Sequence, residues 1–353
     1  MVRPIRVVIV DDSALMREML KDIVGREPGM EVVGIARDAY EARDVIKATN
    51  PDVITLDVEM PKMDGLSFLE KIMTLRPTPV IMISSQTRDG SDAAIRALEL
   101  GAIDCVAKPG GGDGQGFEAA ARELIAKILI AATARLSMRR PTAGAPRLPT
   151  PRRAGSGGRL IAIGASTGGV ERLRDILAVM PADCPPIVIT QHMGPSYMPS
   201  FATRLDRLSA PTVQLAAHGA KLIQGVVHIA PGDRHLAIVR EAGGLVCHIQ
   251  DTPPVSGHRP SVDVLFASVA KAAGANAVGV ILSGMGRDGA QGMKAMHDAG
   301  AHTIGEQESS CVVYGMPRAA RDAGGVAVEL PLSQIPAEML RAIDAIGEPP
   351  RNF

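Results

Sequence analysis

A segment rich in proline, glycine and arginine divides the sequence into two stretches, each of which alternates short apolar runs with amphipathic ones. The segment covers residues 138–158 and has no periodic apolar pattern, so it cannot bury enough surface to offset the entropy of ordering it. Residues 137–159 hold six arginines and no acidic side chain, although the whole chain has zero formal net charge. We interpret the segment as a solvated linker between two domains, residues 1–137 and 159–353, rather than as a nucleic-acid or membrane patch.

The composition excludes several classes of protein. The 353 residues are 46% hydrophobic, which is more than one core needs, and the four cysteines are widely spaced without a CxxC pair. Neither a zinc site nor a disulfide framework is therefore expected. No apolar stretch reaches about 18 residues, and the first apolar run is too short for a signal sequence. These features predict a cytoplasmic protein without membrane insertion.

The first half alternates five short strand-like runs with segments of helical period. This alternation predicts a five-stranded parallel sheet covered on both faces, a doubly wound, flavodoxin-like α/β domain. Such sheets place their ligands beyond the carboxyl ends of the strands. The expected strands are residues 5–10, 31–36, 52–57, 79–84 and 104–109, and the last expected helix is residues 117–136.

Polar side chains stand at those strand ends. Asp11 and Asp12 follow the first strand, Asp57 ends the third, Ser84 ends the fourth and Lys108 lies in the fifth. Three carboxylates can gather without strong repulsion around a divalent cation, and ligation by oxygen alone suits Mg²⁺. The central acid would then act as a nucleophile toward a phosphoryl group.

This constellation is similar to the receiver domain of two-component response regulators over residues 4–130. The resemblance implies that Asp57 accepts a phosphoryl group from a histidine kinase. It also implies that Asp11, Asp12, Asp57 and the backbone carbonyl of Glu59 hold Mg²⁺.

Two further positions match receivers, and one departs from them. Ser84 and Lys108 match the residues that contact the phosphoryl group. Cys105 stands where receivers commonly carry an aromatic switch residue, which puts an aromatic-rotamer account of signal transmission in doubt.

The second half again alternates strand and helix patterns from Arg159 onward. Residues 235–251 contain a central Gly-Gly pair and predict a β-hairpin insertion. We therefore expect a doubly wound, mostly parallel α/β domain with a hairpin.

A possible nucleophile lies at the first strand–helix junction of this half. Gly164, Ser166 and Gly168 satisfy GxSxG, a pattern that permits a sharp turn which exposes a serine hydroxyl. The backbone N–H of Thr167 and the following helix N-terminus could face an oxyanion. The alternative is that this glycine-rich turn binds a phosphate, although GASTGG lacks the GxGxxG order.

A serine nucleophile needs a base and an orienting carboxylate. His192 follows the next apolar run and should lie at the same sheet edge as Ser166, whereas His235 and His258 are second choices in loops. Asp288 follows another buried strand, and its rival, Asp233, lies in a Pro-Gly-Asp turn of a kind that is commonly structural. The favoured set is Ser166, His192 and Asp288.

Five long strings resemble the chemotaxis protein-glutamate methylesterases, the CheB family: IGASTGG, QHM, HIAPGDRHL, SGHRPSVDVLF and ILSGMGRDG. The resemblance implies Ser166 as nucleophile, His192 as base and Asp288 as its partner, with Thr167 and Met285 shaping the oxyanion site. The implied reactions are hydrolysis of glutamate methyl esters on chemoreceptors and deamidation of glutamines. No cofactor is expected in this domain, and phosphorylation of the receiver would activate it.

Two alternatives come from other classes of protein. The second half could be a phosphorylation-gated binding module without esterase chemistry, with the GASTGG turn as a phosphate cradle. The chain could also be a DNA-binding response regulator. No short basic helix-turn-helix follows the linker, residues 160–353 are acidic in balance, and aromatic side chains are scarce, so no nucleic-acid partner is expected.

Overall fold

The computed structural model describes residues 3–84, 87–108, 114–134, 148–149 and 158–346. Its residues fall into two compact units, Met1–Met138 and Arg139–Phe353, and each is described by itself. Most of the expected linker, residues 138–158, lies outside the described residues.

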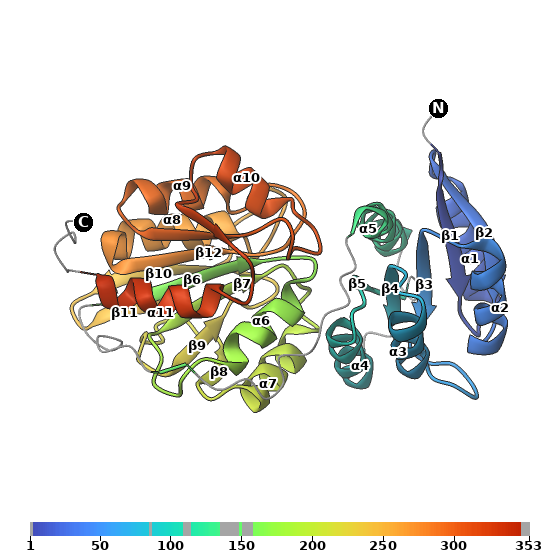
Figure 1. Cartoon of the computed structure of the whole chain (residues 1–353), viewed down its shortest axis with the longest axis horizontal. Helices are drawn as coiled ribbons and strands as arrows, with labels where there is room; N and C mark the ends of the chain where they lie inside the picture. The colour runs from blue at the N-terminus through green and yellow to red at the C-terminus, as the bar shows by residue number, and fades with distance from the viewer. Residues whose placement is uncertain (1–2, 85–86, 109–113, 135–147, 150–157, 347–353) are drawn as a thin grey trace. The chain divides into compact units, whose positions relative to one another are not determined.

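The first unit is a five-stranded parallel sheet in the order β2-β1-β3-β4-β5 (Figure 1). The chain begins in the middle of this sheet and builds outward in both directions, so β1 and β3 are neighbours. The strands are β1 (Ile5–Val10), β2 (Met30–Ala36), β3 (Val53–Asp57), β4 (Val80–Ser84) and β5 (Asp104–Ala107). The helices are α1 (Ala14–Gly25), α2 (Ala39–Thr49), α3 (Gly65–Leu75), α4 (Arg88–Glu99) and α5 (Gly114–Thr133).

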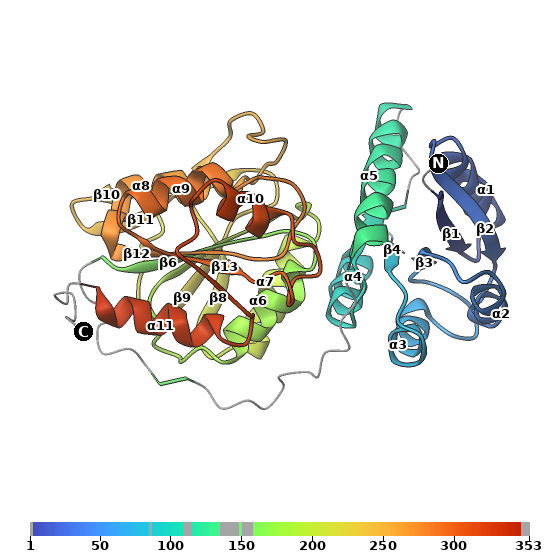
Figure 2. The same cartoon turned by 45° about the horizontal axis from the view of Figure 1, so that its top comes forward.

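Helices cover both faces of this sheet, with α1 and α5 on one face and α2, α3 and α4 on the other (Figure 2). The central strands β3 and β4 are therefore buried on both sides and β1 nearly so, which explains their continuous apolar runs, whereas the edge strand β2 is only partly buried. Four helices begin where a side-chain oxygen accepts a hydrogen bond from a backbone N–H of the first turn. The capping residues are Ser13, Asp38, Asp64 and Thr87.

The second unit is built on a seven-stranded parallel sheet in the order β14-β13-β12-β6-β7-β9-β8. Its strands are β6 (Leu160–Ala165), β7 (Ile187–Gln191), β8 (Thr212–Leu215), β9 (Val226–Ile229), β12 (Ala277–Ile281), β13 (His302–Glu306) and β14 (Val328–Leu330). Its α-helices are α6 (Gly169–Ala178), α7 (Met198–Leu208), α8 (Val262–Ala273), α9 (Ala290–Asp298), α10 (Met316–Asp322) and α11 (Ile335–Ala345). A short 3-10 helix, η1 (Gly274–Asn276), follows α8.

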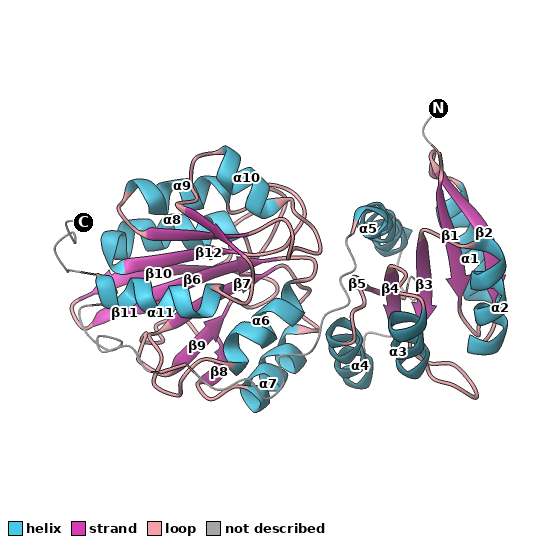
Figure 3. Ribbon diagram, viewed as in Figure 1, coloured by secondary structure: helices cyan, strands magenta, loops and turns pink. Residues whose placement is uncertain are grey.

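This sheet is also covered on both faces, by α6, α7 and α11 on one and by α8, α9 and α10 on the other (Figures 2 and 3). The antiparallel hairpin of β10 (His235–Glu241) and β11 (Gly244–Gln250) forms a separate two-stranded sheet. Apolar side chains of α8, such as Phe266, share one core with hairpin residues such as Leu236. In the sheet, β7 lies on one side of β6 and β12 lies on the other. The chain therefore builds outward from β6 in both directions, and a crevice is expected at the carboxyl ends of these strands.

The predicted fold class is confirmed for both halves. The helix expected at residues 117–136 runs instead from Gly114 to Thr133. The predicted hairpin insertion is present beside the main sheet, in which every strand pair is parallel.

Candidate functional site

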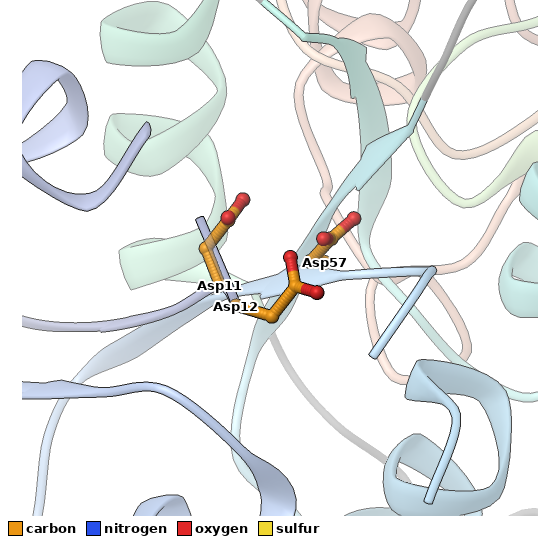
Figure 4. Close-up of side chains that lie close together, drawn as sticks. All are labelled: Asp11, Asp12 and Asp57. Carbon is orange, nitrogen blue, oxygen red and sulfur yellow. The ribbon is translucent and has the colours of Figure 1, made fainter. Parts of the chain in front are cut away.

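Three carboxylates gather at one edge of the first sheet. Asp11 and Asp12 directly follow β1, and Asp57 ends β3, the neighbouring strand. One carboxylate oxygen of each lies within 4.8 Å of those of the others, and the three side chains converge in Figure 4. The parallel sheet thus brings Asp57 to Asp11 and Asp12, which lie 46 and 45 residues before it in the sequence.

A lysine lies against the central carboxylate. Lys108 Nζ donates to Asp57 Oδ2 at 2.8 Å, while the N–H of Glu59 donates to Oδ1 at 3.2 Å. Burial raises the pKa of Asp57, and the lysine offsets part of that effect. Ser84 is buried at the end of β4, and its carbonyl accepts from the N–H of Lys108 at 2.9 Å.

The cluster has the properties expected of a cation site. Asp11 Oδ2 is buried and has no hydrogen-bond partner among the described residues. Burial and the nearby charge of Asp57 raise the pKa of Asp11 to about 6. A divalent ion would give Asp11 Oδ2 the partner that it lacks and would offset the repulsion between the carboxylates. A site made of oxygen donors fits Mg²⁺.

The GxSxG turn joins β6 to α6 in the second unit. The Ser166 N–H donates to the carbonyl of Ser283 at 3.1 Å, and Gly168 adopts a left-handed φ of 76°. Gly284 backs the turn closely, because a Cβ there would lie 2.7 Å from the Cβ of Ser166. The serine is thus held between two strand ends, and its side chain is partly exposed.

The histidine and the aspartate lie beside this turn on the adjacent strands. The N–H of His192 donates to the carbonyl of Ala165 at 3.0 Å, which places His192 next to Ser166 across β6 and β7. Asp288 lies in the loop after β12, on the other side of β6, and its Oδ2 lies 2.7 Å from His192 Nε2. Three strand ends that are neighbours in space therefore carry the three residues.

The Asp288 carboxylate is held at the N-terminus of α8. It accepts from the Ser261 hydroxyl at 2.7 Å, and from the N–H groups of Val262 at 2.7 Å and Asp263 at 3.1 Å. Burial alone would raise the pKa of this group, but these bonds and His192 outweigh it and lower the pKa. Asp288 is therefore ionised at neutral pH and can orient the imidazole.

The opposite nitrogen of the imidazole is left for the serine. His192 Nδ1 is buried and has no hydrogen-bond partner among the described residues, and no hydrogen bond joins it to the Ser166 hydroxyl there. Catalytic hydrogen bonds are often long in the absence of substrate. The arrangement provides a nucleophile, a base and an orienting acid at one sheet edge.

The second-choice histidines have other surroundings. Both ring nitrogens of the buried His235 are engaged, with the carbonyl of Pro253 at 3.1 Å and the N–H of Ser261 at 3.1 Å. His258 stacks on His192, with ring centroids 3.8 Å apart and planes 8° apart. Burial and the charge of His192 lower the pKa of His258 to about 4.

The remaining predicted residues fall around the same edge or away from it. The carbonyl of the buried Thr167 accepts from the Ser283 hydroxyl at 2.9 Å, and Met285 is 46% exposed in the loop that leads to Asp288. Asp233, the rival carboxylate, is about half exposed and lies 3.5 Å from its neighbour Arg234.

Sequence reasoning missed several polar residues that support this edge. Ser261 caps α8, and a serine before an apolar helical run could have indicated that cap. Gln191, inside the QHM string, and the buried pair of Arg172 and Glu306 carry no signal in the sequence. Their roles depend on contacts between distant segments.

No helix in the described part of the chain is both long and apolar enough to cross a membrane.

Residues 161–339 match the family model described as CheB methylesterase, and residues 7–114 match that of the response regulator receiver domain. Each match falls within one of the two units.

Relatives match over almost the whole chain. A protein-glutamate methylesterase/protein-glutamine glutaminase of Rhizobium etli is 52% identical over 98% of this chain and 98% of its own. One of Caulobacter vibrioides is 54% identical over 95% and 97%, and one of Salmonella typhimurium is 52% identical over 97% of each. The crystal structure of the Thermotoga maritima CheB methylesterase catalytic domain is 35% identical, with a TM-score of 0.51, and covers 53% of this chain and 99% of that chain. The chain belongs to the CheB family of protein-glutamate methylesterases/protein-glutamine glutaminases that carry a response regulator receiver domain.

Proposed function

We propose that this protein hydrolyses glutamate methyl esters on chemoreceptors, deamidates glutamines at the same site, and is activated by phosphorylation of Asp57. The carrying observation is the 2.7 Å contact between His192 and Asp288 beside the Ser166 turn. We assign the receiver to residues 1–137, the linker to 138–158 and the catalytic domain to 159–353. We place the protein in the cytoplasm, with a chemotaxis histidine kinase as its phosphodonor.

The first half of the reaction forms an acyl-enzyme. The Ser166 hydroxyl attacks the side-chain ester carbonyl while His192 Nδ1 takes its proton. The C–O bond to the methoxy group then breaks, and the imidazolium returns the proton to it, so that methanol leaves. A glutamine side chain follows the same course and releases ammonia.

The second half regenerates the serine. Water attacks the glutamyl ester, His192 takes a proton from it, and the serine oxygen leaves with that proton. Asp288 stabilises the imidazolium in both halves, because the carboxylate is ionised and held by three further hydrogen bonds. The Thr167 N–H and the backbone beside Met285 would hold the negative oxygen of the tetrahedral intermediate.

Regulation would begin at the acidic cluster of the receiver. Asp57 would attack the phosphorus of the kinase's phosphorylated histidine, and the P–N bond would break as the acyl phosphate forms. Lys108, which already lies 2.8 Å from the Asp57 carboxylate, would offset the added negative charge. Asp11, Asp12 and the carbonyl of Glu59 would hold Mg²⁺, which would neutralise charge on the transferring group. Ser84 would contact the phosphoryl oxygens.

The test is methanol release from methylated receptor membranes by the Ser166→Ala variant of the full chain. The variant should lose at least about a thousandfold in rate, because no other group replaces the nucleophile. The matched control is Ser209→Ala, which lies just after α7, toward the amino ends of the strands, and should behave as wild type.

The same variant separates the alternative function. A phosphorylation-gated binding module would keep its affinity for receptors in Ser166→Ala and would release no methanol in the wild type. Wild-type turnover that survives Ser166→Ala unchanged would contradict the proposed nucleophile.

A further inference from the structure

Gln191 links the nucleophile to the base through the backbone. It ends β7 directly before His192, and only 2% of it is exposed. Its Nε2 donates to the carbonyl of Ser166 at 2.9 Å and to the carbonyl of His192 at 3.1 Å. One buried amide thus bridges the main chain at both catalytic residues.

The orientation of this amide follows from its partners. Both are carbonyl oxygens, which only accept, so the NH₂ group must face them. The price of this arrangement is that Oε1 is buried without a hydrogen-bond partner among the described residues. Leaving such an atom unsatisfied costs about 1–3 kcal/mol. A core selected for stability alone would favour an apolar side chain here.

One planar peptide links the hydrogen bond from Gln191 to the expected oxyanion site. The Ser166 carbonyl and the Thr167 N–H belong to one trans peptide unit, so they point in opposite directions and rotate together. The Ser166 carbonyl is held by Gln191 and by the Gly169 N–H, which donates at 2.7 Å. Fixing this carbonyl therefore fixes the direction of the Thr167 N–H.

We infer that Gln191 is a positioning residue for acyl transfer: it aims the Thr167 N–H at the developing oxyanion and ties that peptide to the backbone of His192. This inference rests on the proposed function, because it assigns Thr167 as an oxyanion donor. It adds a residue that touches neither substrate nor the reacting atoms.

The GASTGG turn is shaped to admit this amide. A Cβ on Gly169 would lie 2.2 Å from Gln191 Oε1 and 2.8 Å from the Cβ of Ala165. Only glycine leaves room for the amide against the start of α6. The second glycine of the GG pair is therefore explained by Gln191.

The first test is Gln191→Met in the full chain, assayed by methanol release from methylated receptor membranes. Methionine has a similar length and no N–H, so the Ser166 peptide loses a donor while the core stays filled. We expect kcat to fall on the order of 10- to 100-fold, and by no more than the full loss of one oxyanion donor would lower it. KM should stay within about threefold of wild type.

The matched control is Thr190→Val, one residue earlier in β7. The Thr190 hydroxyl is buried and has no hydrogen-bond partner among the described residues, so an isosteric valine removes no bond. Its kcat should stay within about twofold of wild type. A general disturbance of β7 would lower kcat in both variants, whereas a positioning role lowers it only in Gln191→Met.

A second variant displaces the amide without changing Gln191 itself. The Cβ added by Gly169→Ala pushes the Gln191 amide away from the Ser166 carbonyl, so this variant should show the same selective loss of kcat. Circular dichroism identifies the variants that fold. Wild-type kcat in whichever of Gln191→Met and Gly169→Ala folds would overturn the inference. If neither folds, Gln191 is a requirement for folding and the inference is likewise overturned.

The proposed function can fail separately. Activity that survives Ser166→Ala removes the nucleophile and, with it, the role assigned to Gln191. Loss of activity in Ser166→Ala with unchanged kcat in folded Gln191→Met leaves the proposed function standing and removes only the inference.

Discussion

His192 is held by contacts on two sides. Asp288 fixes one edge of its ring at 2.7 Å, and the ring of His258 covers one face at a centroid distance of 3.8 Å. Because the pKa of His258 is lowered to about 4, His258 is neutral at pH 7. A neutral ring can accept a stacked imidazolium, whereas a charged one would repel it.

This neutrality can be tested with His258→Phe and His258→Arg. Phenylalanine keeps a flat neutral ring, so the acid limb of the pH dependence of kcat/KM should stay where it is in wild type. Arginine places a permanent positive charge over His192 and opposes its protonation, so the limb should move to lower pH. Two charges about 4 Å apart in water interact by about 1 kcal/mol, which corresponds to a shift of roughly 0.7 pH unit. An acid limb that His258→Arg moves upward would contradict this account.

Positions at the strand ends could be predicted from the sequence, and the contacts between their side chains could not. Ser166, His192 and Asp288 each follow an apolar run, and the parallel sheet places such ends at one edge. The stacking of His258 and the hydrogen bond from Ser261 to Asp288 join segments 66 and 27 residues apart. No local pattern encodes such contacts, because they depend on how the loops pack.

A buried ion pair connects the helix after the nucleophile to a strand two places away in the sheet. Arg172 on α6 lies 3.0 Å from Glu306 at the end of β13, and each side chain is at most 1% exposed. Arg172 also donates to the carbonyl of Gly168 at 3.0 Å, and Glu306 accepts from the N–H of Ser283 at 2.8 Å. The pair therefore joins the two backbone segments that hold Ser166.

Removing one partner of this pair should destabilise the catalytic unit strongly. Arg172→Met leaves an unpaired buried carboxylate, which costs about 3–5 kcal/mol. The urea midpoint for loss of esterase activity should fall by roughly 1–2 M, given an m-value of about 2–3 kcal/mol per molar urea. Adding Glu306→Gln to Arg172→Met should recover part of this loss, because the unpaired charge is gone.

The control for the ion pair is Arg341→Met on α11. Arg341 pairs with Glu338 at 2.6 Å, but the arginine side chain is 66% exposed, so its loss should cost no more than about 1 kcal/mol. Equal midpoints for Arg172→Met and Arg341→Met would show that burial of the first pair has no energetic consequence.

Elements could be predicted from periodicity, but their order in the sheet could not. The expected strand at residues 79–84 and β4 agree to one residue, because a run buried on both faces is apolar throughout. The position of β12 between β6 and β13 depends on a crossover longer than 100 residues. That order brings Asp288 to His192, so the candidate site depends on topology that no single segment contains.

Control of a hydrolase by phosphorylation requires that the two units communicate, and the receiver lacks one familiar device for this. Cys105 stands in β5 at the position that is commonly aromatic, is 5% exposed and points its Sγ at the carbonyl of Ala94 on α4, 3.5 Å away. A buried thiol has no ring to swing between an outer and an inner rotamer. A signal from Asp57 must therefore pass through other groups, such as the backbone between Lys108 and Ser84.

Phosphorylation should still raise the esterase rate of the full chain. A small-molecule phosphodonor with Mg²⁺ should increase methanol release about tenfold, which needs a preference of about 1.4 kcal/mol for the active arrangement when phosphorylated. Asp57→Asn should abolish the response, because an amide cannot form the acyl phosphate. The control is Asp44→Asn, an exposed carboxylate on α2, which should respond as wild type.

The unphosphorylated receiver is expected to restrain the catalytic domain rather than merely to lack a stimulus. A chain without residues 1–140 should then release methanol faster than the full chain in the absence of a phosphodonor. Its rate should not change when Mg²⁺ is added. If the receiver instead supplied positive contacts only after phosphorylation, the shortened chain would match the basal rate of the full one. A shortened chain slower than the unphosphorylated protein would exclude restraint, because removing an inhibitor cannot lower the rate.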